Sequence, residues 1–128
     1  KVNKKRNFLC KNYKNNLLKE IDGFANILFS SKDDSNGHLF ALILKDPIIR
    51  NEFLKDLSKS GVQATSHYEP LHSSPAKDLY NCKVSKSGCV ESVNLASKIV
   101  RLPLHYELST KDVKNISNIV LECINKFR

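Results

Sequence analysis

The stretch His38-Leu-Phe-Ala-Leu-Ile-Leu44 decides which fold this sequence can adopt. A short, almost continuous apolar run of this kind is typical of a strand that is buried on both faces. Asp46-Pro47 follows it, and these two residues are suited to the N-cap and the first position of a helix. The apolar stripe of that helix consists of Ile49, Phe53 and Leu57. Gly61 is placed to end the helix, so the sequence predicts a strand followed by a helix.

The remainder of the chain predicts further short elements on both sides of this unit. A second strand is expected at Val62–Tyr68. Short helices are expected at Pro75–Tyr80 and Glu91–Ile99, with a polar loop at 30–36, an irregular loop at 81–88 and an extended piece at Arg101–Leu104. Ser109 is expected to begin the last helix, with Asp112 as its partner in a capping box.

The first segment predicts a basic amphipathic helix. Its apolar stripe consists of Val2, Leu9, Tyr13, Leu17 and Ile21, and Gly23 is placed to end it. We expect one domain over 1–128, in which 1–21 is a helix that leads from another domain and 22–128 is the body. A small sheet covered by helices buries these stripes most simply, which is an α/β (α+β) fold class. The residues alone leave open whether the strands run parallel or antiparallel.

The charge of the chain is uneven, with a net charge of +8 at pH 7 over 128 residues. Residues 1–20 contain seven basic residues and one acidic residue, which leaves this end at +6. A basic binding module that contacts nucleic acid or a protein partner is therefore an alternative function, although no known basic motif accompanies the charge. No apolar run approaches the ~20 residues that cross a bilayer, so we expect no membrane contact and a cytoplasmic location.

The cysteines and histidines predict no metal site. The four cysteines, none of which forms a C-x-x-C pair, are Cys10, Cys82, Cys89 and Cys123. We expect them to be reduced, although Cys82 and Cys89 flank a loop and their pairing stays open. His67 and His72 straddle a proline, and no third metal ligand accompanies them.

Three segments together resemble one enzyme family. They are NGHLFALIL at 36–44, GVQATSHYEPLHSSPA at 61–76 and RLPLHYELS at 101–109. Their order and spacing resemble the C-terminal part of the DegT/DnrJ/EryC1/StrS sugar-nucleotide aminotransferases. Within that family they look most similar to dTDP-4-amino-4,6-dideoxygalactose transaminases. The resemblance implies the small domain of a fold-type I pyridoxal-phosphate enzyme, with a mostly antiparallel sheet.

The same resemblance implies a function and a set of site residues. The substrate-binding residues that it implies are Tyr68 and His72, then His67, and in second rank Asn36 and His38. Enzymes of this kind use pyridoxal 5'-phosphate and act as homodimers. They move an amino group from glutamate to a nucleotide-linked 4-keto-6-deoxy sugar for surface polysaccharide or lipopolysaccharide biosynthesis.

The chain also departs from the family in a way that bears on its activity. Nothing in it resembles the segment that carries the Schiff-base lysine, so no catalytic residue is assigned here. The first residue is a lysine and the chain contains no methionine. We therefore expect a fragment whose partner is the large domain of the same enzyme, and we expect this fragment alone to bind no cofactor and to be inactive.

Overall fold

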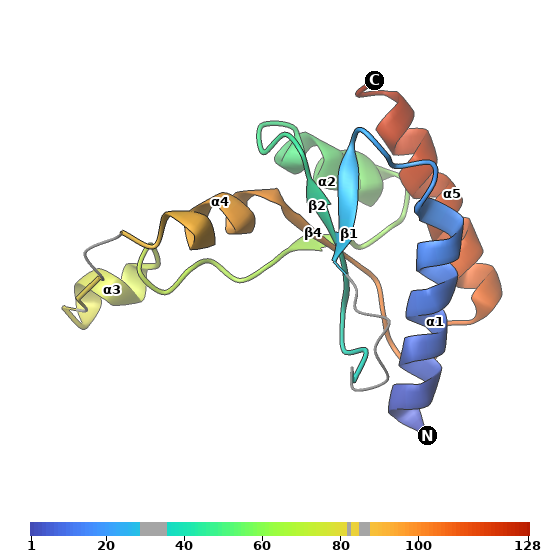
Figure 1. The fold of residues 1–128 in the computed structure, drawn as a ribbon, viewed down its shortest axis with the longest axis horizontal. Coiled ribbons are helices and arrows are strands. Elements are labelled where there is room, and N and C mark those ends of the chain that lie inside the picture. Colours follow the sequence, from blue (N-terminus) through green and yellow to red (C-terminus); the bar gives the residue numbers. More distant parts are fainter. Residues whose placement is uncertain (29–35, 82, 85–87) are drawn as a thin grey trace.

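A small antiparallel sheet forms the centre of the computed structural model, which describes residues 1–28, 36–81, 83–84 and 88–128 (Figure 1). Its strands are β1 (Ala25–Leu28), β2 (Phe40–Leu44), β3 (Thr65–Ser66) and β4 (Ile99–Leu102). They lie in the order β1-β2-β4-β3, and every neighbouring pair is antiparallel. The predicted α+β class with a mostly antiparallel sheet is confirmed.

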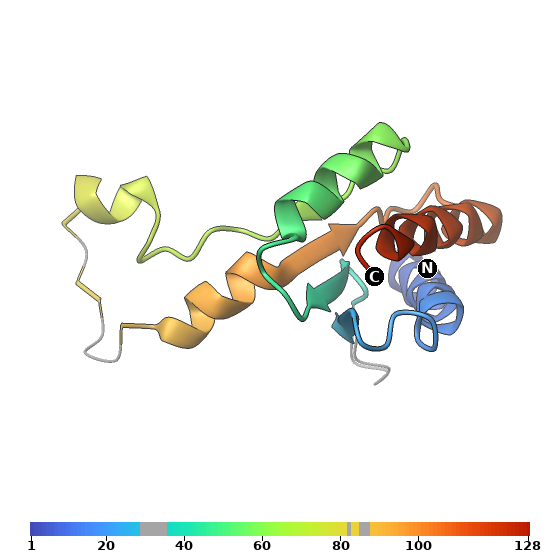
Figure 2. The same cartoon turned by 90° about the horizontal axis from the view of Figure 1, so that it is seen from above.

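Helices cover one face of this sheet (Figure 2). These helices are α1 (Val2–Leu17), α2 (Arg50–Lys59) and α5 (Thr110–Asn125). Two further helices, α3 (Pro75–Leu79) and α4 (Val90–Lys98), extend away from this core (Figure 1). α1 packs beside α5, and α2 packs against α5 and β4. We call α1, α2, α5 and the sheet the body of the molecule. Among the described residues, no helix is long and apolar enough to cross a membrane.

The two faces of the sheet differ because side chains alternate along each strand. In β2, Phe40, Leu42 and Leu44 are buried in the core under the helices. Ala41 and Ile43 point to the opposite face, where they lie across from Arg101 and Ile99. We call this second surface the open face. The expected burial of β2 is confirmed for the core face, whereas Ile43 on the open face is only half-buried.

Aromatic side chains fill much of the core. The rings of Tyr13 and Phe40 stack with centroids 4.9 Å apart, and the Tyr13 hydroxyl donates to the Pro103 carbonyl at 2.9 Å. Burial raises the pKa of Tyr13 above its usual range and raises that of the neighbouring Cys10 thiol to about 11. Cys10 thus behaves as a small buried apolar residue.

Several predicted boundaries are wrong. The strand expected at Val62–Tyr68 is reduced to Thr65–Ser66, because Val62 instead closes the end of α2 through a bond from its N–H to Leu57 O. β1 was not expected at all. Ile99, expected at the end of a helix, begins β4, and the extended piece expected at Arg101–Leu104 contributes to that strand as a central member of the sheet.

The end of α1 and the start of α2 also differ from expectation. α1 ends at Leu17 rather than near Ile21, although Ile21 is still buried by the turn that follows. Asp46 accepts from the Ile48 N–H at 2.8 Å and so forms a turn, and α2 begins three residues after Pro47. Asp46 and Pro47 therefore form a turn that precedes α2 and do not form its N-cap and first position.

The last helix confirms its predicted start. Ser109 Oγ accepts from the Asp112 N–H at 3.2 Å, and Asp112 Oδ2 accepts from the Ser109 N–H at 2.9 Å. The Ser109 hydroxyl also donates to Asp112 Oδ2 at 2.7 Å, and this bond together with the one from the Ser109 N–H holds the pKa of the Asp112 carboxyl below its usual value. The buried stripe of α5 includes Val113, Val120 and Ile124.

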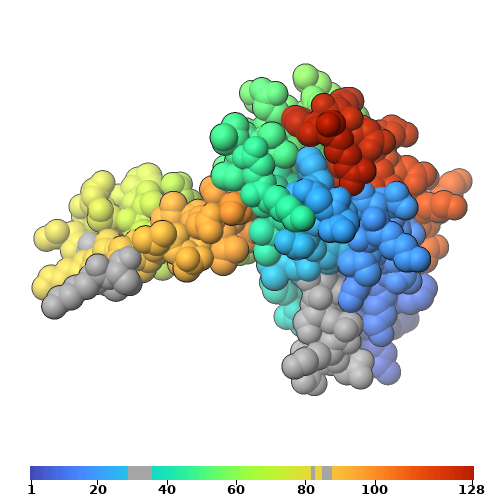
Figure 3. Space-filling view, turned by 45° about the horizontal axis from the view of Figure 1, so that its top comes forward, coloured from blue at the N-terminus to red at the C-terminus, as the bar shows by residue number. Residues whose placement is uncertain are grey.

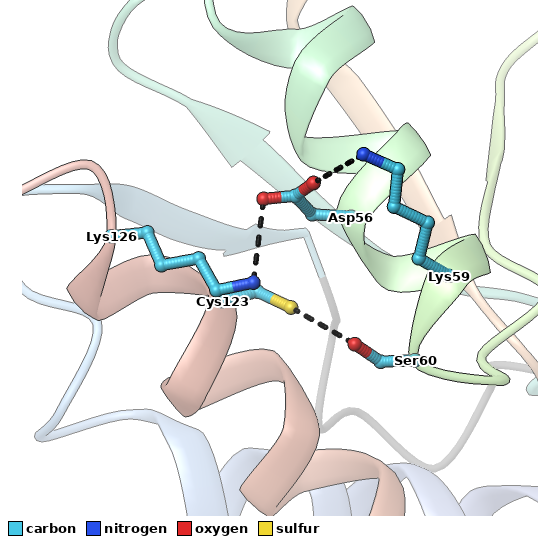
Figure 4. Close-up of polar contacts among 5 residues, drawn as sticks. All are labelled: Asp56, Lys59, Ser60, Cys123 and Lys126. Carbon is cyan, nitrogen blue, oxygen red and sulfur yellow. Dashed lines mark hydrogen bonds and ion pairs between the residues drawn. The ribbon is translucent and has the colours of Figure 1, made fainter.

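A small polar cluster joins α2 to α5 (Figure 4). The Asp56 carboxylate lies 3.6 Å from Lys59 Nζ and 3.5 Å from Lys126 Nζ. Ser60 Oγ lies 4.0 Å from the buried Cys123 Sγ. Because both lysines are largely exposed, these ion pairs add little stability. Of the two, only the Asp56–Lys126 pair connects the two helices, since Lys59 belongs to α2 itself.

A long excursion leaves the body between β3 and β4 (Figure 3). We call residues 67–98, of which 82 and 85–87 are not described, the arm. It carries α3 and α4, and neither helix contains a buried residue. The loop expected at 30–36 lies outside the described residues except for Asn36, and so does Cys82 of the possible Cys82–Cys89 pair.

Candidate functional site

A groove runs between the first part of the arm and α4. One cavity in it, of about 350 Å³, is lined by side chains that include Arg50, Ser66, Tyr68 and Ser97. An adjoining cavity of about 420 Å³ is more apolar and is lined by Leu71, His72, Leu95 and Ile99 together with His67 and Tyr68. Arg50 also spans from α2 to the carbonyl of Ala96 at 3.1 Å, and this bond joins the groove wall to the body.

Three of the residues predicted to bind substrate lie along this groove. The rings of His67 and Tyr68 have centroids 5.2 Å apart, and the Tyr68 side chain is 77% exposed. His67 Nδ1 and His72 Nε2 are buried, yet neither has a hydrogen-bond partner among the residues that the structure describes. Buried polar nitrogens without partners are costly, so these two atoms are suited to accept or donate to a group from outside the described chain.

The other two predicted residues form a separate group at the entry to β2. Asn36 Oδ1 accepts from the His38 N–H at 3.1 Å and lies 2.8 Å from His38 Nδ1. His38 also lines a smaller cavity of about 180 Å³ with Gln63, Thr65 and Arg101. The side-chain bond fixes the imidazole of His38 toward Asn36.

Gly37 places this second group close to α1. Its φ of +57° is a backbone conformation that favours glycine. A Cβ at this position would collide with the side chain of Asn7 and lie 3.0 Å from the Asn7 backbone nitrogen. Because only a glycine fits this approach, the Asn-Gly-His segment is set by packing as well as by turn chemistry.

The five predicted residues therefore form two groups rather than one pocket, and Arg101 lies between them. Arg101 lines the cavity of His38, and its guanidinium carbon lies 5.3 Å from the centroid of the Tyr68 ring. Sequence reasoning missed Arg50 in the groove and Arg101 between the two groups. The signal for Arg101 was a lone charge within the apolar run Ile99–Leu102, which is unusual unless that face of the strand has a polar partner.

The groove does not fit a resident cofactor or metal ion. A pyridoxal-phosphate enzyme needs a primary amine to hold the aldehyde, and none of the lysines that the structure describes lines either cavity of the groove. Lys77 and Lys83 line a separate apolar cavity on the arm. Among the described residues, no group of three or more histidine, cysteine or acidic side chains is placed to hold a metal ion. What the groove offers instead is hydrogen bonding and an aromatic face.

Comparison with solved structures shows the same fold in sugar aminotransferases. The chain matches an aminotransferase of pseudaminic acid biosynthesis from Helicobacter pylori with a TM-score of 0.79 and 22% identity, over 98% of this chain and 33% of that one. It matches the pyridoxal-phosphate form of a putative sugar aminotransferase from Streptococcus pneumoniae with a TM-score of 0.83 and 20% identity, over 99% of this chain and 32% of that one. At 20% and 22% sequence identity, these matches show a shared fold and no more than that.

Sequence comparison gives the family. One relative, the UDP-4-amino-4,6-dideoxy-N-acetyl-beta-L-altrosamine transaminase of Helicobacter pylori (strain ATCC 700392 / 26695), is 27% identical over 99 residues. That match covers 76% of this chain, and the chain spans about a quarter (26%) of the relative's length. The model of the DegT/DnrJ/EryC1/StrS aminotransferase family matches residues 1–121. The chain therefore belongs to the DegT/DnrJ/EryC1/StrS aminotransferase family.

Proposed function

We propose that this chain is the C-terminal small domain of a pyridoxal-phosphate-dependent aminotransferase that acts on a nucleotide-linked keto sugar. Membership of the family, and matches that span about one third of solved aminotransferase chains, support this reading. We further propose glutamate as the amino donor, a 4-keto-6-deoxy sugar of the galactose type as the acceptor, and a role in surface polysaccharide biosynthesis. These finer assignments rest on the three segments that resemble galactose-type transaminases.

The groove is the part of this chain proposed to contact the sugar nucleotide. The observation that carries this proposal is the pair of buried imidazole nitrogens, on His67 and His72, that lack partners among the described residues beside an exposed Tyr68. Hydroxyl and phosphate oxygens of a sugar nucleotide are matching partners for imidazole nitrogens. The Tyr68 hydroxyl can donate to an oxygen of the same ligand, while its ring offers a face for stacking.

The side chains in the groove indicate which part of the reaction this chain supports and which part the cofactor supplies. When bound elsewhere in the enzyme, the cofactor supplies the electron sink for moving the amino group. The side chains of this chain bind and orient the sugar part, and Leu71, Leu95 and Ile99 give the groove an apolar wall. Asn36 and His38 are proposed as contacts from the second group, with the His38 imidazole held by its bond to Asn36.

The partners proposed for this chain are the large domain of the same enzyme and a second copy of that enzyme in a homodimer. Both the open face and the arm expose apolar side chains that such partners can cover. The exposed apolar residues on these two regions include Leu28, Leu71, Leu79, Tyr80, Val90, Val93 and Leu95. A cytoplasmic location remains part of the proposal.

The basic first helix supports one alternative function, the binding of nucleic acid, and this alternative can be tested. If residues 1–20 bind nucleic acid, the affinity should fall steeply as salt is added. The logarithm of the affinity should decrease linearly with the logarithm of the salt concentration. No binding of duplex DNA by the chain at low salt would remove this alternative. Binding with that salt dependence would support it over the aminotransferase reading of the basic helix.

The kinetic test uses the complete enzyme that contains this sequence. Tyr68→Phe and His72→Ala should each raise KM for the keto-sugar nucleotide or lower its kcat/KM, with KM for glutamate and cofactor content little changed. Tyr80→Phe is the matched control, since Tyr80 also lies exposed on the arm but lines none of the groove cavities described above. Kinetics equal to the unmodified enzyme in both groove variants would contradict the assignment.

A further inference from the structure

We propose that Arg101 is the positioning residue that holds Tyr68 at the mouth of the groove, a role that rests on the proposed function of Tyr68. Arg101 lies in the middle of β4, directly opposite Thr65 of β3. Its side chain points to the open face, away from the core residues Val100 and Leu102 on the same strand. It is therefore placed beside the point where the chain leaves the sheet to form the arm.

Three contacts join this one side chain to three residues of the segment 65–68. Arg101 Nε donates to the Ser66 carbonyl at 3.0 Å, and Nη2 donates to Thr65 Oγ1 at 3.1 Å. Its guanidinium carbon lies 5.3 Å from the centroid of the Tyr68 ring. The two hydrogen bonds fix the plane of the guanidinium. The positively charged group then makes a cation–π contact with the Tyr68 ring.

The local structure explains why such a contact is needed. β3 contains two residues and pairs with β4 alone at the edge of the sheet. Tyr68 follows two residues later and is 77% exposed, so the surrounding core restricts its ring very little. A cation over the face of an exposed aromatic ring is worth about 0.5–1 kcal/mol, which is enough to favour one ring position over others.

An arginine is specifically suited to this role. Its planar fork can donate in two directions while its face stacks on a ring, whereas a lysine ammonium is a single point charge. Arg101 also lines the cavity that contains His38. By holding Tyr68 on one side and facing His38 on the other, Arg101 sets the spacing of the two groups of candidate substrate contacts.

A tryptophan reporter measures this positioning directly, because the chain contains no tryptophan. Tyr68→Trp places one emitter at the exposed position, and an indole ring accepts a cation over its face at least as well as a phenol. We expect time-resolved anisotropy of the Tyr68→Trp chain to show a restricted ring. Adding Arg101→Gln should reduce the residual anisotropy to that of a freely rotating side chain, with the far-ultraviolet circular dichroism unchanged.

Two further variants make the measurement decisive. Arg101→Lys, which keeps the charge but not the fork, should give an intermediate anisotropy, and it serves if Arg101→Gln fails to fold. Arg50→Gln is the matched control, since Arg50 lines the same groove but bonds to the carbonyl of Ala96. Equal anisotropy in all Arg101 variants, or an equal loss in Arg50→Gln, would overturn the positioning role.

The reporter needs no substrate, so its result separates this inference from the proposed function. Loss of ring order in Arg101→Gln, together with unaltered kinetics for Tyr68→Phe in the complete enzyme, would support the positioning role and contradict the substrate role of Tyr68. Unchanged ring order together with impaired Tyr68→Phe kinetics would overturn the positioning role alone.

Discussion

The body and the arm of this molecule are built in opposite ways. In the body, α1, α2 and α5 each bury an apolar stripe against the core face of the sheet. In the arm, α3 and α4 bury no residue, and the arm exposes Tyr68, Leu71 and Leu79 at 77%, 83% and 76%. The body therefore holds its fold by its own packing, whereas the arm presents apolar surface that the described chain does not cover.

This difference assigns the two regions different roles. Large exposed apolar surface is typical of a contact region rather than of a finished monomer surface. The groove residues lie where the arm meets the body. There Arg101 of the body contacts the Tyr68 ring of the arm, and Arg50 of the body donates to the Ala96 carbonyl of the arm. A rigid body that supports a site on a less packed excursion is a common arrangement for binding residues.

The largest expected effect is a loss of unfolding free energy when the core of the body is disrupted. Phe53 is fully buried, and its ring contacts those of Phe24 and Phe127 at centroid distances of 5.4 and 6.0 Å. Phe53→Ala should lower the free energy of unfolding by about 3–5 kcal/mol because it leaves a cavity in the core. Urea denaturation measures this loss. Leu79→Ala on the arm is the control and should leave the urea midpoint unchanged; a comparable loss there would erase the distinction between body and arm.

A smaller effect is expected at the approach of Gly37 to α1. Gly37→Ala combines a positive φ with a collision against Asn7. Gly61→Ala is the matched control, because Gly61 has a φ of +83° and nothing within 4 Å of its Cβ position. The control should cost about 1–2 kcal/mol from the left-handed backbone alone. Gly37→Ala should cost about 1–3 kcal/mol more, the usual range for overpacking. Equal thermal midpoints for the two variants would show that the approach to α1 is looser than described.

The next effect concerns the start of α5. Ser109→Ala removes the hydroxyl that accepts from the Asp112 N–H and should cost about 1 kcal/mol of unfolding free energy. Ser74→Ala offers a comparison on the arm, since Ser74 is the N-cap of α3 but makes no side-chain cap bond. The Ser74 hydroxyl donates to the exposed Leu71 carbonyl at 2.9 Å instead, so Ser74→Ala should lower the unfolding free energy by less than Ser109→Ala does. A larger loss for Ser74→Ala than for Ser109→Ala would contradict the comparison.

The smallest effect is the pH dependence of the same cap. Hydrogen bonds from Ser109 hold the pKa of Asp112 below its ordinary value of 3.8. A carboxyl with a lowered pKa in the folded state stabilises the fold at neutral pH, and this contribution disappears as the pH falls through the lowered pKa. The urea midpoints of the unmodified chain and of Asp112→Asn should therefore converge as the pH is lowered from neutral to below 3.8 and through the lowered pKa of Asp112. A difference that stays constant over this range would rule out the charge as its source.

Much of the body could be predicted from the sequence, because its stripes are local and periodic. The apolar run of β2 and the capping box at Ser109 both carry signals within a few residues. β1 was not predicted, and β4 was predicted only in part, as the extended piece at Arg101–Leu104. Each is a four-residue strand whose pairing with β2 is decided by the tertiary fold. The spacing of Val93, Ala96 and Val100 also continued a helical period into what is the start of β4.

The candidate site was predicted in part, and for a different reason. The residues Tyr68, His72, His67, Asn36 and His38 came from a resemblance between segments, which names residues without placing them. Their division into two groups follows from the path of the arm, which contains no periodic signal. Arg101 was missed because its contacts cross from β4 to Thr65 and Tyr68, more than 30 residues earlier in the chain.

Hydrogen exchange, followed by residue in this chain and in the complete enzyme that contains it, tests the central claim most directly. If the arm is completed by contacts from outside the described chain, its amides should exchange rapidly in the isolated chain and become protected in the complete enzyme. Those along residues 66–73 should gain further protection when a sugar nucleotide is added, while amides of α1 and α5 stay equally protected throughout. An arm that is already as protected as the body in the isolated chain, or that gains nothing in the complete enzyme with sugar nucleotide, would contradict the account.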